Sequence, residues 1–107
     1  MNAMYDQLIE NLDRMLSLDM KETSNFKAIC RFRGLMVDKG MPEDVAGQYA
    51  MTAEVSITID LTDEEITGLM DPMAQMARDL YFNFLNAGFA KDQLMDLGKQ
   101  LSLTLEG

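Results

Sequence analysis

The spacing of apolar residues along this chain predicts helices over most of its length. Within residues 3–18, apolar side chains recur every three or four positions and acidic side chains fall on the other side, which is typical of an amphipathic helix. A second helix is expected to follow a polar cap at residues 23–25 and to end at Lys39 and Gly40.

Signals for the start of a helix recur further along the chain. Pro42 suits the first turn of a short helix, and residues 62–65 form a capping box that predicts a helix from Asp63. Pro72 predicts a kink or a break, with a further helix from there to about residue 87. A last helix is expected over about residues 90–97.

Two segments alternate apolar and polar residues with a period of two, which indicates strands. They run from Val55 to Leu61, where β-branched residues are frequent, and from Leu101 to Leu105. The two strands could pair within one chain or between chains, and helices would have to cover one face of the pair. The alternative is that tertiary contacts keep one or both segments helical.

These patterns predict a mainly α fold, a compact bundle of four or five helices with room for a short two-stranded β element. A length of 107 residues fits a single domain over residues 1–107. An apolar content of 48% indicates a folded chain despite the formal net charge of −9.

The charges are segregated along the chain. Residues 21–39 contain five basic residues, whereas residues 40–77 contain no Lys, Arg or His. The acids of that second stretch are Glu43, Asp44, Glu54, Asp60, Asp63, Glu64, Glu65 and Asp71. A strongly acidic protein is repelled by nucleic acid and by anionic lipid, so we expect neither as a direct ligand. A basic protein is the expected partner.

Residue types that support catalysis are scarce. The chain has no His, which removes the usual activation of a Ser or Cys nucleophile, and it has no phosphate-binding loop. Its acids do not follow the order of a calcium-binding EF-hand loop, and one Cys without His excludes a structural zinc site. We therefore expect a protein that is not an enzyme, with no catalytic residues, no metal and no cofactor. A hydrolase built on two carboxylates remains an alternative on composition alone.

Cys30 is the only cysteine, so an intrachain disulfide cannot form. Its neighbours Phe26, Ile29 and Phe32 predict a buried, inert thiol. The first residues lack the basic and apolar regions of a signal peptide, and no apolar stretch is long enough to span a membrane. The expected location is the cytoplasm, which is the host cytosol if the protein is encoded by a phage.

The acidic stretch has two interpretations. It forms a surface that enters a basic groove of a partner, or its acids stabilise helix starts through the helix dipole. The candidate contacts are Glu43, Asp44, Glu54, Asp60, Asp63, Glu64 and Glu65. The basic residues upstream could neutralise these acids in the folded protein, which would weaken the first interpretation.

A second candidate surface is rich in methionine and aromatic residues. Its members are Met73, Met76, Tyr81 and Phe84. They either form the core stripe of a helix or contribute to an apolar interface. The second possibility would make the chain a homodimeric helical adaptor or a small chaperone.

The leading functional expectation is a small acidic inhibitor that blocks the nucleic-acid-binding surface of a basic protein or ribonucleoprotein complex. In its size, its charge and its lack of catalytic motifs, the chain is similar to small phage-encoded antagonists such as anti-CRISPR proteins. That similarity rests on no motif and assigns a role to no residue.

Overall fold

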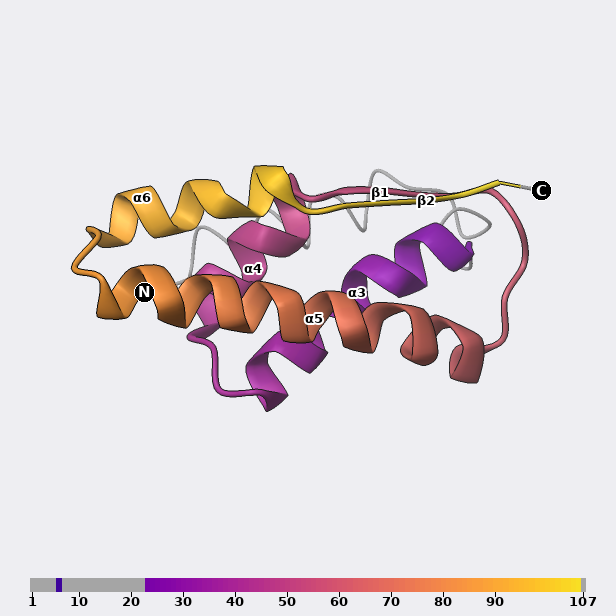
Figure 1. The fold of residues 1–107 in the computed structure, drawn as a ribbon. Coiled ribbons are helices and arrows are strands. Elements are labelled where there is room, and N and C mark those ends of the chain that lie inside the picture. The colour runs from indigo at the N-terminus through magenta and orange to yellow at the C-terminus, as the bar shows by residue number, and fades with distance from the viewer. Residues whose placement is uncertain (1–5, 7–22, 107) are drawn as a thin grey trace.

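The computed structural model describes residue 6 and residues 23–106, so the helix expected over residues 3–18 lies outside the described residues except at Asp6. The elements are α3 (Ser24–Asp38), α4 (Glu43–Thr52), β1 (Glu54–Ile57), α5 (Asp63–Asn86), α6 (Lys91–Met95), the 3-10 helix η1 (Asp96–Gln100) and β2 (Ser102–Leu105) (Figure 1). This arrangement confirms the expected mainly α fold with a short two-stranded β element.

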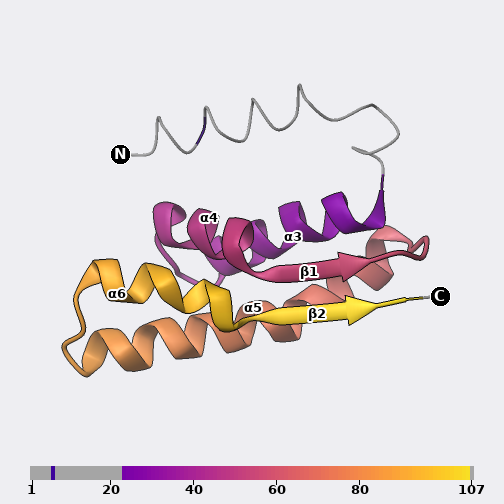
Figure 2. The same cartoon turned by 90° about the horizontal axis from the view of Figure 1, so that it is seen from above.

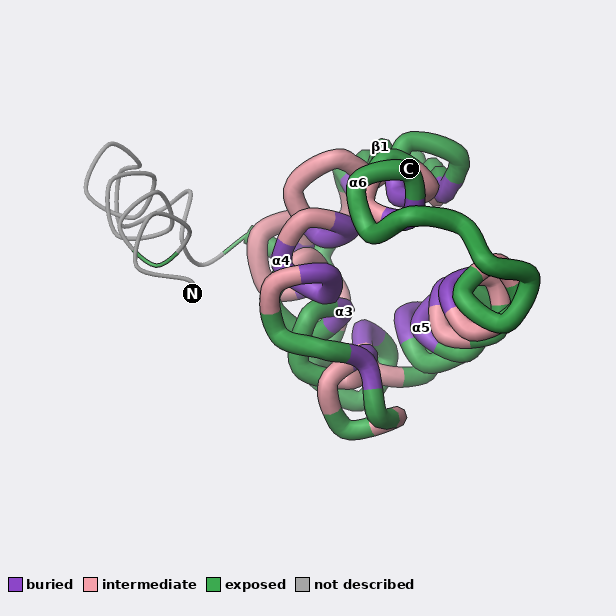
Figure 3. Tube along the Cα trace, turned by 90° about the vertical axis from the view of Figure 1, so that its left-hand side faces the viewer, coloured by how far each residue is buried: buried purple, intermediate pink, exposed green. Residues whose placement is uncertain are grey.

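The hydrophobic core lies between α3, α4 and the long helix α5. Phe32 of α3, Tyr49 of α4, and Ile66 and Met70 of α5 are its largest fully buried side chains, together with Met36, Val45 and Leu94. In Figure 3, α3 and α4 lie on one side of the molecule and α5 lies on the other, and the buried parts of the three helices face the space between them. Burial of each such side chain contributes about 1.5–3 kcal/mol, so this core fixes the relative position of the three helices.

Helix α5 runs without interruption through Pro72, so the predicted break at this residue is wrong. A proline inside a helix lacks an N–H donor and crowds the carbonyl four residues earlier, at a cost of about 3 kcal/mol. The buried residues Ile66 and Met70 precede Pro72, and Met73 and Ala77 follow it in the same core. Their combined burial exceeds the cost of the proline.

The ends of the helices follow local sequence signals. The predicted capping box is confirmed, because Thr62 Oγ1 accepts the N–H of Glu65 at 3.1 Å and Glu65 Oε1 accepts the N–H of Thr62 at 2.9 Å. Pro42 lies at the N-cap of α4, one residue before the position expected. Gly40 and Gly88 follow α3 and α5 with φ of 101° and 93°, which a side chain would disfavour.

Strands β1 and β2 pair in parallel, with Val55 opposite Leu103 and Ile57 opposite Leu105. Parallel strands need a long crossover connection, which α5, α6 and η1 provide between β1 and β2. Strand β1 ends at Ile57 instead of the predicted Leu61. In Figure 2, β1 lies between β2 and α3.

The first turn of α3 explains why β1 is short. Asn25 Oδ1 accepts the N–H of Ile57 at 2.8 Å, and Ser24 Oγ accepts the N–H of Leu61 at 2.7 Å. Asn25 thus binds the last residue of β1 and Ser24 binds the loop after it, both in place of a neighbouring strand. Ser24 is the one polar side chain classed as buried within the described residues, and the hydrogen bond to Leu61 accounts for its position.

Cys30 is exposed, which corrects the prediction of a buried thiol. The core stripe of α3 consists of Ala28, Phe32 and Met36, spaced by four residues. Cys30 is two residues from both Ala28 and Phe32, and two residues turn a helix by about 200°. Its side chain therefore lies on the face opposite the core.

Candidate protein-binding surface

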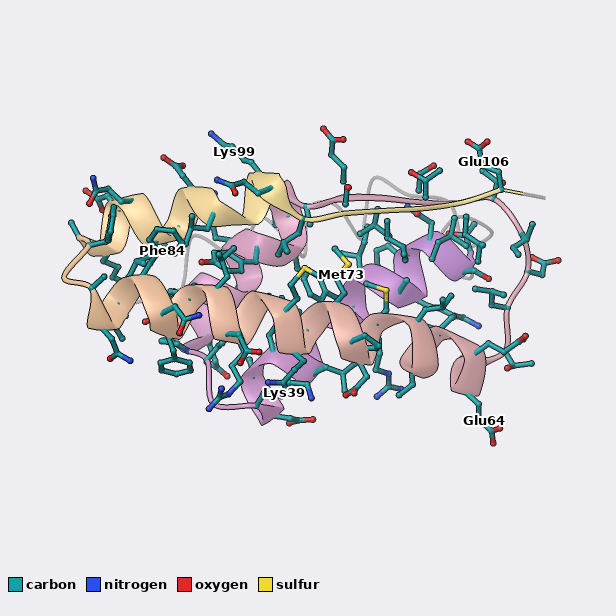
Figure 4. All side chains as sticks on the ribbon, viewed as in Figure 1. Lys39, Glu64, Met73, Phe84, Lys99 and Glu106 are labelled. Carbon is teal, nitrogen blue, oxygen red and sulfur yellow. The ribbon has the colours of Figure 1, made fainter. Side chains whose placement is uncertain are left out.

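Acidic side chains gather where β1 leads into α5. Asp60 lies in the connecting loop, and Asp63, Glu64 and Glu65 form the first turn of α5. Glu106 follows the last residue of β2. Because parallel strands end at the same edge of a sheet, Glu106 lies at the same end of the long axis as Glu64, and Figure 4 shows the two side chains on opposite sides of that end. We call these five residues the acidic end.

Two of the five acids have structural partners. Glu65 belongs to the capping box, and its hydrogen bonds with the backbone and side chain of Thr62 lower the pKa of its carboxyl group. Asp63 Oδ1 lies 4.0 Å from Lys27 Nζ, and the side chain of Asp63 is largely exposed, whereas that of Lys27 is partly buried. A solvent-accessible pair at this distance has little effect on stability.

The other three acids of this surface have no side-chain partner among the described residues, although Glu64 lies in the first turn of α5, where the helix dipole favours an acid. Asp60, Glu64 and Glu106 are exposed, and none forms an ion pair or a side-chain hydrogen bond with any described residue. Asp60 and Glu106 lie outside the helices, so the helix dipole does not explain them. Their charges are available to a partner.

The structure separates the seven acids predicted as contacts. Glu43 and Asp44 begin α4, and Asp44 forms an ion pair with Lys91 at the start of α6. The start of α6 lies at the opposite end of α5 from Glu64 (Figure 1). Helix α5 has 24 residues and is therefore about 36 Å long. Glu43 and Asp44 cannot share a small contact surface with the acidic end.

The pair of Asp44 and Lys91 shifts the pKa of both groups. The hydrogen bond from Lys91 holds the pKa of Asp44 below its usual value, and Asp44 raises the pKa of Lys91. Asp44 Oδ1 also accepts the N–H of Val45 at 2.9 Å. These contacts fasten α6 to the start of α4, which is a structural role.

The remaining acids of the predicted stretch also differ from one another. Asp71 Oδ1 lies 3.1 Å from Lys39 Nζ, which joins α5 to the end of α3. Glu54 is exposed at the start of β1, in register with Ser102, and forms no ion pair with a described residue. Glu54 therefore adds a charge to the outer face of the sheet at some distance from the acidic end.

The predicted apolar surface is divided by the fold. Met73 and Tyr81 are buried in the core, where a partner has no access to them. Met76 is 60% exposed, and Phe84 is half-buried with its ring 4.9 Å from that of Phe89. The sequence pattern did not resolve these cases because α5 carries apolar residues around most of its circumference.

The structure also contains an open pocket of about 460 Å³ between α3 and α5, which the sequence did not predict. It is lined by Phe26, Lys27, Cys30, Arg31, Gly34, Asp63 and Ile66. The sequence pattern did not reveal this pocket, because the apolar neighbours of Cys30 indicated a position in the core. The available signal was the spacing of Lys27 and Arg31, which are four residues apart and lie on the same side of α3. Within residues 23–106, no group of three or more acidic or cysteine side chains is arranged to hold a metal ion.

None of the helices described is long and apolar enough to cross a membrane. Comparison of the chain with protein-family models, with curated proteins and with solved structures found no match in any of the three.

Proposed function

We propose that this chain is a binding protein without enzymatic activity that occupies the nucleic-acid-binding surface of a basic protein or ribonucleoprotein complex. The acidic end makes the contact, and its carboxylates take the places of nucleic-acid phosphates. The protein acts as an inhibitor in the cytoplasm, in the manner of phage antagonists such as anti-CRISPR proteins.

The observation that carries this proposal is that the exposed carboxylates of Asp60, Glu64 and Glu106 have no ion-pair partner among the described residues. An acid that caps a helix or pairs with a lysine has a structural reason to be present. These three acids have no such contact with the described residues. Asp60 lies in the loop before α5, Glu64 in the first turn of α5 and Glu106 directly after β2, so the fold sets the backbone positions of the three acids before a partner binds.

The alternative of a homodimeric adaptor has weaker support. The large apolar side chains exposed on α5 are Met76, at 60%, and Leu85, at 41%. They are nine residues apart, which places them on opposite sides of the helix. Phe89 is also exposed, but it lies beyond α5 and packs on Phe84. These residues do not combine into one apolar face on α5 of the size that a stable dimer requires.

The proposal is tested by reversing charges that have no structural partner. The double variant Asp60→Lys/Glu64→Lys changes the acidic end and leaves Glu65 in its capping box. The control variant Asp38→Lys/Asp92→Lys makes the same change in net charge at exposed acids on α3 and α6. Neither pair of residues forms an ion pair with a described residue, so both variants should fold, which urea unfolding checks.

Each protein is immobilised and exposed to a bacterial lysate at low salt, and a salt gradient then releases what has bound. Wild type and control are expected to retain the same nucleic-acid-binding protein and to release it at moderate salt, because ions screen charges beyond about 8–10 Å. The Asp60→Lys/Glu64→Lys variant should lose it. Equal retention by both variants, or a partner that only denaturant removes, contradicts the proposal.

A further inference from the structure

The outer edge of β2 carries backbone groups that no described residue binds. The N–H of Glu54 donates to the carbonyl of Leu101 at 2.9 Å, and the N–H of Thr58 donates to the carbonyl of Leu105 at 3.0 Å. In a parallel ladder, alternate residues of a strand face the same neighbour. The backbone N–H and C=O groups of Leu103 and Leu105 therefore face β1, and those of Ser102 and Thr104 face away from it.

The two outer edges of the sheet differ. The edge of β1 is covered by α3, whose Asn25 accepts the N–H of Ile57. The edge of β2 has no corresponding cover, because Ser102 and Thr104 are exposed and have no partner within the described part of the chain. Figure 2 shows β2 on the side of the pair away from α3. Such an edge is a template for an additional strand.

The surroundings of this edge define what kind of strand fits. The outer face of the sheet bears Glu54 beside Ser102, and Glu106 follows β2. On its other face, the sheet covers the core through Leu103 and Leu105, which are half-buried. An added strand therefore has one face toward acids and one face toward apolar residues.

Helix α5 extends this apolar side. Lys39, which follows the last residue of α3, contacts Asp71 and Arg78 on one flank of α5. Leu69 and Met76 are about 160° around the helix from these two residues, on the opposite flank. On that flank Leu69 is half-buried against the core, and Met76 is 60% exposed.

We propose that the edge of β2 binds an extended segment of the basic partner in which lysine or arginine alternates with apolar residues. Backbone hydrogen bonds join the segment to Ser102 and Thr104, its cations face Glu54 and Glu106, and its apolar side chains face α5. This inference rests on the proposed function and adds the kind of segment that is recognised. A second copy of this chain fits less well, because its net charge of −9 would meet the same charge.

The inference is tested with two capped octapeptides of equal composition. One alternates lysine and valine, and the other has four lysines followed by four valines. Binding is measured by amide chemical shifts and by titration at low salt. The alternating peptide is expected to bind more tightly and to shift the amide signals of Ser102 and Thr104.

Variants in β2 test the backbone hydrogen bonds to the added strand without changing the charge of the protein. Thr104→Pro removes an outward N–H and no bond of the β1–β2 ladder, whereas Thr104→Val keeps that N–H and serves as the control. Ser102→Pro is a second test, since the preceding Leu101 has the extended conformation that proline favours, with φ of −93° and ψ of 130°. Each proline variant should weaken binding of the alternating peptide about tenfold, and Thr104→Val should leave it unchanged.

The outcomes distinguish this inference from the proposed function. Equal binding of both peptides, with shifts confined to the acidic end, overturns the edge site and leaves the proposed function in place. Shifts of Ser102 and Thr104 that grow with protein concentration in the absence of peptide assign the edge to a second copy and overturn the inference. If neither peptide binds wild type and the shifts of residues 102–105 stay constant, both the edge site and the acidic contact are contradicted.

Discussion

At the scale of single residues, Tyr49 joins three elements of the fold. It belongs to α4, its hydroxyl donates to the carbonyl of Leu94 in α6 at 2.6 Å, and its Cα lies against Gly98 in η1. The side chain is fully buried. Burial raises the pKa of Tyr49 to about 12, and the neighbouring Tyr81 adds to this effect. The neutral hydroxyl is therefore favoured in the folded state.

This shift predicts how stability changes at alkaline pH. The unfolded chain has the ordinary tyrosine pKa of 10.0, so the stabilising effect is complete below that pH and is lost as the pH rises toward about 12. Tyr49→Phe should be less stable than wild type by about 0.5–1.5 kcal/mol at pH 8, because it lacks the hydrogen bond. The difference should shrink as the pH approaches 11.

Urea unfolding at several pH values measures this difference. Lys91 also loses its charge at high pH, but both proteins contain it, so its contribution cancels in the comparison. A difference between wild type and variant that stays constant from pH 8 to pH 11 would show that ionisation of Tyr49 is not coupled to folding.

Gly98 gives a second prediction at this scale. A Cβ at this position would lie 2.5 Å from Thr52 Oγ1 and 2.8 Å from the Cα of Tyr49, so α4 and η1 would have to move apart. Gly98→Ala is expected to reduce the free energy of unfolding by about 1–3 kcal/mol. Gly68→Ala is the control, because Gly68 lies exposed in α5 with no atom within 4 Å, and the added methyl group should stabilise by about 0.5–1 kcal/mol. Similar changes for both variants in thermal unfolding would refute this close packing.

Single residues also mark the limit of prediction from sequence. The apolar pattern correctly indicated a helix around Cys30, but the side of the helix that packs is fixed by Phe32 and Met36. Met73 and Met76 are the same residue type and lie only about 60° apart around α5, yet Met73 is buried in the core and Met76 is 60% exposed. The sequence alone does not show which face of each helix packs against the core.

At the scale of elements, the first turn of α3 holds the end of β1. Asn25→Ala should reduce the free energy of unfolding by about 1–2 kcal/mol, because it leaves the N–H of Ile57 without its acceptor. Asn25→Asp is the matched control, since it keeps an acceptor oxygen and favours a helix start. Denaturant unfolding measures both variants, and equal losses of stability would contradict a specific role for the acceptor.

Where a strand or helix ends depends on contacts with residues that are far away in the sequence. Alternation predicted the two strands, but the alternating pattern continued to Leu61, whose N–H is bound by Ser24 from a segment 37 residues earlier. Pro72 predicted a kink or a break, but α5 continues through this residue because side chains on either side of it are buried in the same core. Capping residues were predicted accurately because their partners lie three residues away.

At the scale of the whole molecule, the stretch from Gly40 to Ala77 contains no basic residue, and its acids lie at two different ends of the fold. Asp44 and Asp71 are paired with lysines from outside this stretch, namely Lys91 and Lys39. Asp60 and Glu64 remain unpaired among the described residues, and β2 adds Glu106 to them. The sequence revealed an excess of acids, and only the fold separates those used internally from those available to a partner.

A protein whose acidic end occupies a nucleic-acid-binding surface has to compete with nucleic acid for its basic partner. The most direct measurement is the fraction of labelled nucleic acid bound to the captured partner as this protein is added. Wild type and Asp38→Lys/Asp92→Lys are predicted to displace the nucleic acid, with a potency that falls as salt rises, while Asp60→Lys/Glu64→Lys is predicted to fail. Displacement that is equal for all three proteins, or nucleic acid that stays bound at saturating wild type, would contradict the proposed function.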